Sequence, residues 1–270
     1  MLRIIHFVQN LSLDITAGAV ISCWFICDFL GVATSVPMLS GLGMAIWLIY
    51  TADHILDARK ATGEIVNPRH AFHRKYQKPV VGIAVLVFVI GVYNAFQLPL
   101  KTIYYGLVLV GLSGLYFVYL KTSITQRFKE SFAALVYTAG LFAGPLSLVP
   151  ELNWDMAILA GFFFLLAYAN LLVLPLFEKE IDEQQGVVSI ATRQGDFGVT
   201  FFFYVTVMLI TLGAVLVVRF SDAFGYAPFL FILMSWSLFA LISKPAFFHK
   251  YQLYRIVGDG IFFLPGLLLL

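Results

Sequence analysis

Long apolar runs alternate with short polar segments along the whole chain. Nine of these runs approach the roughly 20 residues that a helix needs to cross about 30 Å of hydrocarbon. They cover residues 11–31, 36–52, 79–98, 102–120, 131–149, 155–177, 197–218, 226–243 and 254–270. Several of the breaks carry proline or glycine, where a helix is expected to start or stop. The pattern predicts an all-α polytopic membrane protein, a nine-helix transmembrane bundle that forms a single domain over residues 1–270.

The composition agrees with a membrane setting. Of the 270 residues, 61% are hydrophobic and 12% are charged, whereas soluble domains carry about 25% charged residues. The net charge of +2 is too small to indicate a nucleic-acid partner. Cys23 and Cys27, one helical turn apart in the first run, are typical of packed thiols rather than of a disulfide framework. We expect no cleavable signal, because the first run contains Asp14 and lacks a basic segment followed by a cleavage site.

The basic residues are distributed unevenly between the two sides that nine spans would create. The side that holds the N-terminus carries 15 of the 17 Lys and Arg residues, and the other side carries Lys101 and Arg219. Because cytoplasmic loops are enriched in Lys and Arg, this asymmetry predicts a cytoplasmic N-terminus and a C-terminus on the opposite side.

Two pairs of acids follow even-numbered runs on the predicted cytoplasmic side. Asp53 and Asp57 follow the second run, and Glu178 and Asp182 follow the sixth with the same acid-x-x-x-acid spacing. Residues at this spacing share one face of a helix, where like charges repel each other. A hard cation between the pairs would relieve that repulsion, and Mg²⁺ takes one or two carboxylates together with water and phosphate oxygens. The sequence therefore predicts two loosely repeated halves and a magnesium site formed by these four acids.

Basic side chains on the same side are candidates for binding the phosphate groups of a substrate. Guanidinium groups match phosphate oxygens geometrically, and Lys adds point charges. The alternative is that these residues fix the topology and contact anionic lipid headgroups. The candidates are Arg59, Arg69, Lys121, Arg127 and Arg193.

These motifs resemble the UbiA superfamily of intramembrane aromatic prenyltransferases, over most of the chain. "ADHILDARKA" with the later "NPRH" is similar to the first Asp-rich motif of that family, and "EKEIDEQQG" with "SIATRQG" is similar to the second. "YLKTSITQR" is similar to the basic stretch after the fourth helix. The first motif departs from the family pattern, since Ala52 replaces an Asn and Ala61 replaces a third acid. The chain is therefore identified as a divergent member with a degenerate first motif.

The resemblance implies a reaction and its substrates. Asp53, Asp57, Glu178 and Asp182 would hold Mg²⁺ and act as catalytic residues on a prenyl diphosphate donor. The prenyl group would pass to an aromatic or other lipophilic acceptor within the membrane, with the isoprenoid tail among the apolar runs. The alternative is a non-catalytic relative that uses the same acids to bind a metal and a phosphorylated lipid, as a binding protein or transporter. Release of pyrophosphate would distinguish the prenyltransferase from the non-catalytic relative.

Three further polar residues are candidates for substrate binding near the predicted cavity. Asn10 and Asp14, with His6, would share one face of the first helix and contact the acceptor, although an interhelical hydrogen bond explains Asp14 equally well. Asn170, eight residues before Glu178, is either a polar wall residue or a packing residue.

Other polar residues have simpler explanations. Arg255 lies at i−4 from Asp259, so we expect a helix-end ion pair between them. His70 and His73 lack a third metal ligand nearby and favour phosphate contact or a solvated loop.

Overall fold

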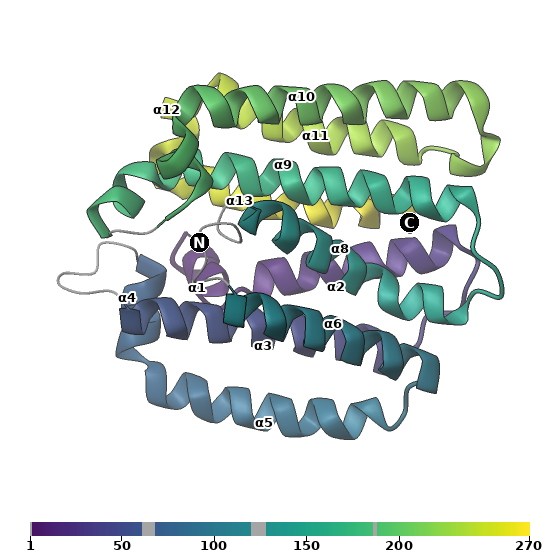
Figure 1. Cartoon of the computed structure of the whole chain (residues 1–270), viewed down its shortest axis with the longest axis horizontal. Helices are drawn as coiled ribbons and strands as arrows, with labels where there is room; N and C mark the ends of the chain where they lie inside the picture. The colour runs from purple at the N-terminus through teal and green to yellow at the C-terminus, as the bar shows by residue number, and fades with distance from the viewer. Residues whose placement is uncertain (1, 61–67, 120–127, 186–187) are drawn as a thin grey trace.

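The computed structural model describes residues 2–60, 68–119, 128–185 and 188–270, and these residues form helices and short connections without a β-strand (Figure 1). The first part of the bundle comprises α1 (Leu2–Asn10), α2 (Leu13–Phe29), α3 (Val36–Lys60), α4 (Pro68–Lys75), α5 (Gln77–Ala95) and α6 (Leu100–Tyr119). The second part comprises α8 (Lys129–Leu148), α9 (Trp154–Gln185), α10 (Ile190–Phe220), η1 (Asp222–Phe224), α11 (Ala227–Ser243), α12 (Pro245–His249), η2 (Lys250–Gln252), α13 (Leu253–Gly260) and η3 (Ile261–Leu268). The predicted all-α class is confirmed for this part of the chain.

Among the described residues, five helices are long and apolar enough to cross a membrane: α3, α5, α8, α9 and α10. A sixth span results if α11 and the segment Pro245–Leu268, which meet at an angle of 95°, are counted together. α2 has 17 residues, and α6 counts as a shorter apolar helix over Leu100–Leu115, the part of it whose side chains are described. The described helices therefore support a membrane protein, but the predicted count of nine spans is not confirmed.

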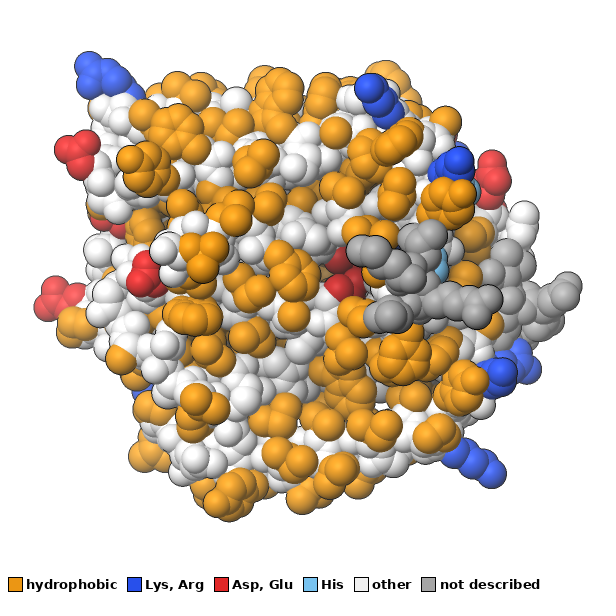
Figure 2. Space-filling view, turned by 180° about the vertical axis from the view of Figure 1, so that it is seen from behind, with side chains coloured by type: hydrophobic (Ala, Val, Ile, Leu, Met, Phe, Trp, Pro, Cys, Tyr) orange, Lys and Arg blue, Asp and Glu red, His pale blue; other side chains and the backbone are white. Residues whose placement is uncertain are grey.

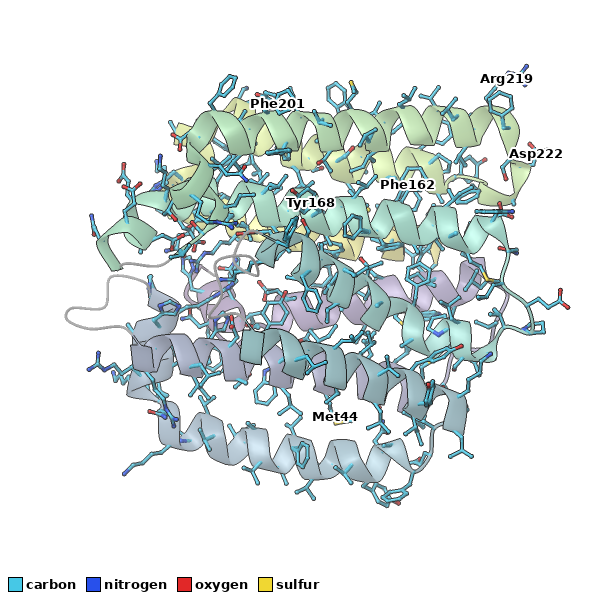
Figure 3. All side chains as sticks on the ribbon, viewed as in Figure 1. Met44, Phe162, Tyr168, Phe201, Arg219 and Asp222 are labelled. Atoms are coloured by element: carbon cyan, nitrogen blue, oxygen red, sulfur yellow. The ribbon has the colours of Figure 1, made fainter. Side chains whose placement is uncertain are left out.

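The long helices lie side by side, so their ends gather at two ends of the bundle (Figure 1). The N-terminus and the ends of α3 and α9 lie at one end, together with the starts of α4, α10 and α13. We call this the basic end, since its side chains include Arg59, Arg69, Lys129, Arg193 and Arg255. The C-terminus lies at the opposite end, where Arg219 and Asp222 project outward (Figure 3).

The interior is formed around α9, which contacts α8, α10, α11 and α13. Phe162 of α9 stacks on Phe231 of α11 with ring centroids 4.6 Å apart, and Phe163 meets the same ring edge-on at 5.9 Å. Aromatic pairs in these geometries add to the stabilisation that comes from burying their large apolar area. The core thus fixes the position of α9, whose C-terminal end carries the second acid pair.

Apolar side chains also cover the outside of the bundle (Figure 2). On α5 the exposed residues include Val85, Leu86 and Phe88, and the helix packs mainly on α3. A soluble protein rarely exposes such a continuous apolar surface. Contact with lipid accounts for it, in agreement with the composition.

Two local features determine where helices begin and end. α1 and α2 are separated at Leu11–Ser12, where Ser12 has a positive φ of 54°. The prediction that Asn10 and Asp14 share a face of one continuous helix is therefore wrong. At the start of α10, Ser189 and Thr192 form a reciprocal capping box that satisfies two backbone N–H groups.

Candidate functional site

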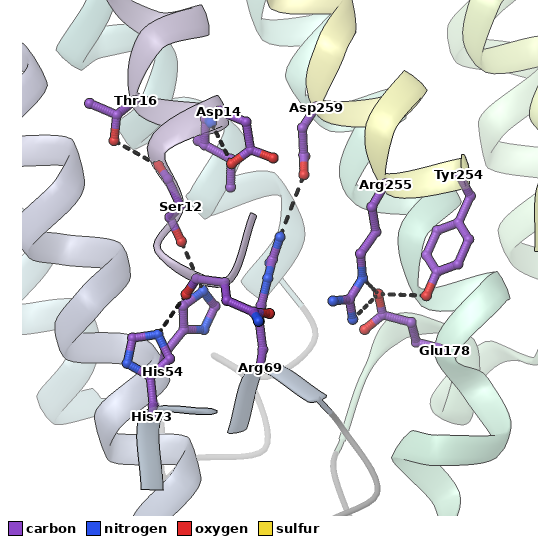
Figure 4. Close-up of polar contacts among 12 residues, drawn as sticks. Ser12, Asp14, Thr16, His54, Arg69, His73, Glu178, Tyr254, Arg255 and Asp259 are labelled. Atoms are coloured by element: carbon purple, nitrogen blue, oxygen red, sulfur yellow. Dashed lines mark hydrogen bonds and ion pairs between the residues drawn. The ribbon is translucent and has the colours of Figure 1, made fainter. Parts of the chain in front are cut away.

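The second acid pair lies at the end of α9, and α13 holds its first member. The Oε1 atom of Glu178 accepts hydrogen bonds from Nε of Arg255 at 2.8 Å and from the Tyr254 hydroxyl at 3.4 Å, and Nη2 of Arg255 is also 2.8 Å away (Figure 4). Tyr254 in turn stacks on Phe177, the residue before Glu178, with centroids 4.6 Å apart. We call this arrangement of Glu178, Tyr254 and Arg255 the α9–α13 clasp. Because the side chain of Arg255 is 5% exposed and that of Glu178 is 19% exposed, the clasp is a mostly buried ion pair.

Asp182 lies one helical turn beyond Glu178 and is half-buried. It hydrogen-bonds to the side chain of Ser189, the residue that caps α10, and it experiences the charges of Glu178, Lys129 and Arg255. The two acids of this pair therefore differ: Glu178 is bound to α13, whereas Asp182 faces the start of α10 and Lys129.

The first acid pair lies at the same end of the bundle, near the end of α3. Asp53 is half-buried, and its charge acts on the hydroxyl of Tyr50 together with those of Asp14, Arg69 and Asp259. The side chain of Asp57 lies outside the described residues. Both acid-bearing helix ends thus reach the basic end, as the repeated spacing predicts, but the convergence of all four carboxylates stays a prediction.

Arg69 connects α4 with the interior of the bundle. Its Nη2 atom lies 3.7 Å from Oδ2 of Asp259, a residue of α13 that is 5% exposed (Figure 4). This distance allows an ion pair but exceeds that of a hydrogen bond. The prediction that Asp259 pairs with Arg255 is wrong, because Arg255 turns to Glu178 and Asp259 faces Arg69.

Arg193 has a different partner in the second half. Its Nη2 atom donates to Oε2 of Glu130 at 2.9 Å, and Glu130 is buried on α8. Its Nε atom also donates to the carbonyl oxygen of Ser189 at 3.4 Å. Arg193 therefore ties the start of α10 to α8, and the sequence did not indicate Glu130 as its partner.

The remaining predicted basic residues are less well defined. Arg59 is exposed near the end of α3. Lys121 and Arg127 fall outside the described residues, so their predicted contact with substrate is not tested.

Two histidines attach α3 and α4 to the turn between α1 and α2. Nε2 of His73 donates to the backbone oxygen of Asn10 at 2.9 Å, and His54 contacts the hydroxyl of Ser12 at 3.2 Å. The rings of His54 and His73 are 5.2 Å apart. Burial lowers the pKa of His73, and the charges of Arg69 and His70 lower it further, while the hydrogen bond to Asn10 opposes the shift. His73 is buried, which rules out the predicted solvated loop for this residue.

Asp14 and Asn170 lie at the inner side of the site. Asp14 is half-buried and accepts a local hydrogen bond from the backbone N–H of Ile15 at 3.0 Å, and its charge acts on Asp259. Asn170 is buried and hydrogen-bonds to Asp259. Asp259 is therefore the residue that brings Arg69, Asp14 and Asn170 together, and sequence reasoning had assigned it to a helix-end pair.

No group of three or more His, Cys, Asp or Glu side chains that could hold a metal ion occurs among the described residues. Of the four predicted acids, Glu178 already accepts hydrogen bonds from Arg255 and Tyr254, and the prediction that Asp53, Asp57 and Asp182 hold a cation is not tested. Since Mg²⁺ keeps several waters and needs only one or two carboxylates beside substrate phosphates, this donor set fits a metal that arrives with a phosphate ligand. It does not fit a cation cage built from protein side chains alone.

No family model, curated protein or solved structure matches this chain.

Proposed function

We propose that this protein transfers a prenyl group from a prenyl diphosphate to an aromatic or other lipophilic acceptor inside the membrane, in a Mg²⁺-dependent reaction. The observation that carries the proposal is that two acid-bearing helix ends, those of α3 and α9, lie at the same basic end of an apolar bundle (Figure 1). A metal needs acids, a phosphate needs cations and an isoprenoid needs an apolar interior, and this end of the molecule offers all three.

Each group of residues has a role in the proposed reaction. Asp53, Asp57 and Asp182 would hold Mg²⁺, which neutralises charge on the leaving pyrophosphate. Glu178 positions Arg255 and Tyr254 through the α9–α13 clasp. We assign diphosphate contacts to Arg59, Arg69, Lys121, Arg127 and Arg193, and we assign the acceptor side to Asn10, Asp14 and Asn170.

The apolar interior completes the arrangement. An allylic cation reacts with water unless water is excluded, and a site between packed helices provides that exclusion. The isoprenoid tail would lie among apolar helices and enter from the surrounding lipid. By the positive-inside rule we place the basic end and the N-terminus on the cytoplasmic side, with the C-terminus opposite.

A second candidate function is Mg²⁺-dependent binding of a phosphorylated lipid without turnover. One contact favours it: Oε1 of Glu178 is already engaged by Arg255 and Tyr254, so one acid of the second pair is occupied by protein. Ala52, which stands where the first motif of the similar family has an Asn, also favours binding without turnover. A binding protein retains affinity for the diphosphate and releases no pyrophosphate.

Pyrophosphate release from membranes or nanodiscs tests the proposal. With prenyl diphosphates of graded length and a lipid extract as the source of acceptors, the wild-type protein should release pyrophosphate when Mg²⁺ is present. Asp57→Ala and Asp182→Ala should each reduce the rate by about 10² or more, because losing a few kcal/mol of transition-state stabilisation has that effect. Asp196→Ala, which removes an exposed acid at the same end, is the matched control and should keep the rate.

Two outcomes would change the conclusion. Diphosphate binding that requires Mg²⁺, without pyrophosphate release by the wild type, would favour the binding protein. Absence of both binding and release with every donor would overturn the proposed function.

A further inference from the structure

A groove opens on the outer surface of α11, where this helix ends and α12 begins at the basic end (Figure 1). Its volume is about 470 Å³, and small-molecule sites typically measure about 300–1,000 Å³. Leu238 and Leu241 of α11 are fully buried in the core, and the groove follows the opposite face of the helix. Its walls include Trp236, Phe239, Ala240, Ser243, Lys244 and Phe247.

The end of α11 turns the chain across the end of the bundle. After Ser243 the chain bends by 95°, and Pro245 begins α12. A proline lacks the N–H group that would continue the preceding helix. α12 reads PAFFH between Lys244 and Lys250, and none of its residues is buried. Exposed aromatic residues flanked by lysines are typical of a segment that lies along a membrane surface.

Aromatic side chains form the apolar wall of the groove. Nε1 of Trp236 donates to Oγ1 of Thr211 on α10 at 3.3 Å, so the polar atom of this ring is already paired. The ring of Phe239 lies 5.3 Å from that of Trp236 and 5.8 Å from that of Tyr204, between centroids. The hydroxyl of Ser243 donates to the carbonyl oxygen of Phe239 at 2.9 Å, within its own helix. The wall therefore offers apolar surface over about 12 Å, the rise of the helix from Trp236 to Lys244.

Lys244 places one positive charge at the end of this apolar wall. It is the one charged residue among the described residues that line the groove, and it forms no ion pair with any of the described acids. Residues 223–258 contain no Asp or Glu. Of the other cations in this segment, Arg255 is held by Glu178, and the ammonium of Lys250 lies 5.1 Å from the centroid of the Tyr251 ring. Lys244 is therefore the cation that remains for a ligand in the groove.

These features fit an amphiphile with a single negative charge. A free phosphate would leave the aromatic wall uncovered, and a neutral hydrocarbon chain would leave Lys244 without a counter-ion. A prenyl diphosphate carries several negative charges, which call for a metal or further cations beside the lysine. A phosphodiester carries one negative charge, and the compact ammonium group of a single lysine matches it.

We propose that this groove binds an anionic phospholipid of the surrounding bilayer. One acyl chain lies along Trp236 and Phe239, and the phosphate group contacts Lys244. None of the four acids assigned to the proposed reaction lines the groove, so the lipid site does not depend on the proposed function.

Native mass spectrometry of the full chain in detergent micelles tests the proposal. The protein is titrated with phosphatidylglycerol and with phosphatidylcholine of the same acyl chains. Both lipids carry a phosphate, but the choline of the second cancels its charge. The wild type should bind the first molecule of phosphatidylglycerol about ten times more tightly, the effect of one charge-assisted hydrogen bond. Equal binding of the two lipids would show non-specific surface lipid only and would overturn the site.

Two lysine variants locate the headgroup. Lys244→Gln should remove the preference for phosphatidylglycerol. Lys250→Gln, six residues along the chain and outside the groove, should keep it. An equal loss in both variants would show a general attraction to positive charge and would overturn the assignment of the headgroup to Lys244.

Two further variants locate the acyl chain. Ala240→Phe fills the groove without changing the charge and should weaken binding of both lipids about tenfold, the effect of leaving about two methylene groups uncovered. Val85→Phe, at an exposed position of α5, is the matched control and should bind both lipids like the wild type. Wild-type affinity in Ala240→Phe would overturn the groove as the place of the chain.

Two competitors identify the source of the phosphate. Glycerol 3-phosphate has the charge but no acyl chain, so it should not displace bound phosphatidylglycerol. A geranylgeranyl diphosphate analogue with Mg²⁺ should not displace it either, because one lysine does not match its charge. Displacement by glycerol 3-phosphate would make the groove a site for free phosphate, and displacement by the analogue would assign it to the isoprenoid substrate. Either result would overturn the lipid site.

Discussion

The ends of α3 and α9 carry the same acid spacing at the same end of the bundle, but the protein holds them differently. At the end of α9, Glu178 is fixed by two residues of α13, with contacts of 2.8 Å to Arg255 and 3.4 Å to Tyr254. At the end of α3, the residue after Asp53 is His54, which is buried and contacts Ser12 in the turn between α1 and α2.

The arginines that follow the two acid pairs differ in the same way. Arg193 makes a hydrogen bond of 2.9 Å to Glu130, whereas Nη2 of Arg69 lies 3.7 Å from Asp259. A repeated spacing thus produces a repeated position in the fold without a repeated environment. The partners decide the environment, and they come from segments that the repeat does not include.

The largest expected effect concerns the α9–α13 clasp. Arg255→Met would leave the carboxylate of Glu178 without its cation in a mostly buried place. Breaking a buried ion pair from one side typically costs about 3–5 kcal/mol. We expect a loss of that order in the free energy of unfolding, measured in detergent by denaturant or thermal unfolding. Adding Glu178→Gln to Arg255→Met should recover part of it.

Lys179→Met provides the control for this prediction. Lys179 follows Glu178 directly and pairs with Asp196 at 2.7 Å, but both side chains are accessible to solvent. Exposed pairs contribute little, so this variant should unfold almost like the wild type. If Lys179→Met and Arg255→Met lost the same free energy of unfolding, the clasp would not be a particular source of stability in the second half.

Much of the fold was predictable because hydropathy marks the middle of each helix. The extension of α9 to Gln185 could not be predicted from hydropathy, since Glu, Lys and Gln continue a helix without adding apolar character. The last run was predicted as one span, yet it divides into α13 and η3. Pro265 lies inside η3, and a proline there removes a backbone donor that a continuous α-helix would use.

The sequence predicted only those parts of the candidate site whose residues lie close together along the chain. The acids of both pairs could be predicted because they lie four residues apart, and the structure places the two helix ends at the same end of the bundle. Arg255 was assigned to Asp259 because that pair is local, whereas its partner Glu178 is 77 residues away. The close approach of Asn170 to Gly258 was not predictable either, because the two residues lie on different helices.

The next prediction compares the two arginines as ligands of a diphosphate. Arg69 faces Asp259 at 3.7 Å, whereas Arg193 donates to Glu130 at 2.9 Å and would have to give up that hydrogen bond to reach a phosphate. Arg69→Gln should therefore weaken Mg²⁺-dependent binding of a diphosphate analogue by about tenfold or more, the effect of one charge-assisted hydrogen bond. Arg193→Gln should change the affinity less and the stability more. Calorimetry with Mg²⁺, and then with a chelator, measures both affinities. A stronger effect of Arg193→Gln would reverse the comparison and place the diphosphate at the start of α10.

The smallest expected effect is a pH dependence of stability in the first half. Burial lowers the pKa of His73 below its ordinary value of about 6.5, so the unfolded chain takes up a proton before the folded one does. The contribution of the neutral imidazole is then fully present above about pH 6.5 and is lost as the pH falls toward the pKa of the folded state. The thermal midpoint should decrease between pH 7.5 and 5, and His73→Phe should make this part of the curve flatter. His249→Phe, at an exposed histidine of the second half, should leave the slope as it is. If the thermal midpoint of His73→Phe depends on pH as strongly as that of the wild type, other groups titrate in this range. The two halves would then not differ in this respect.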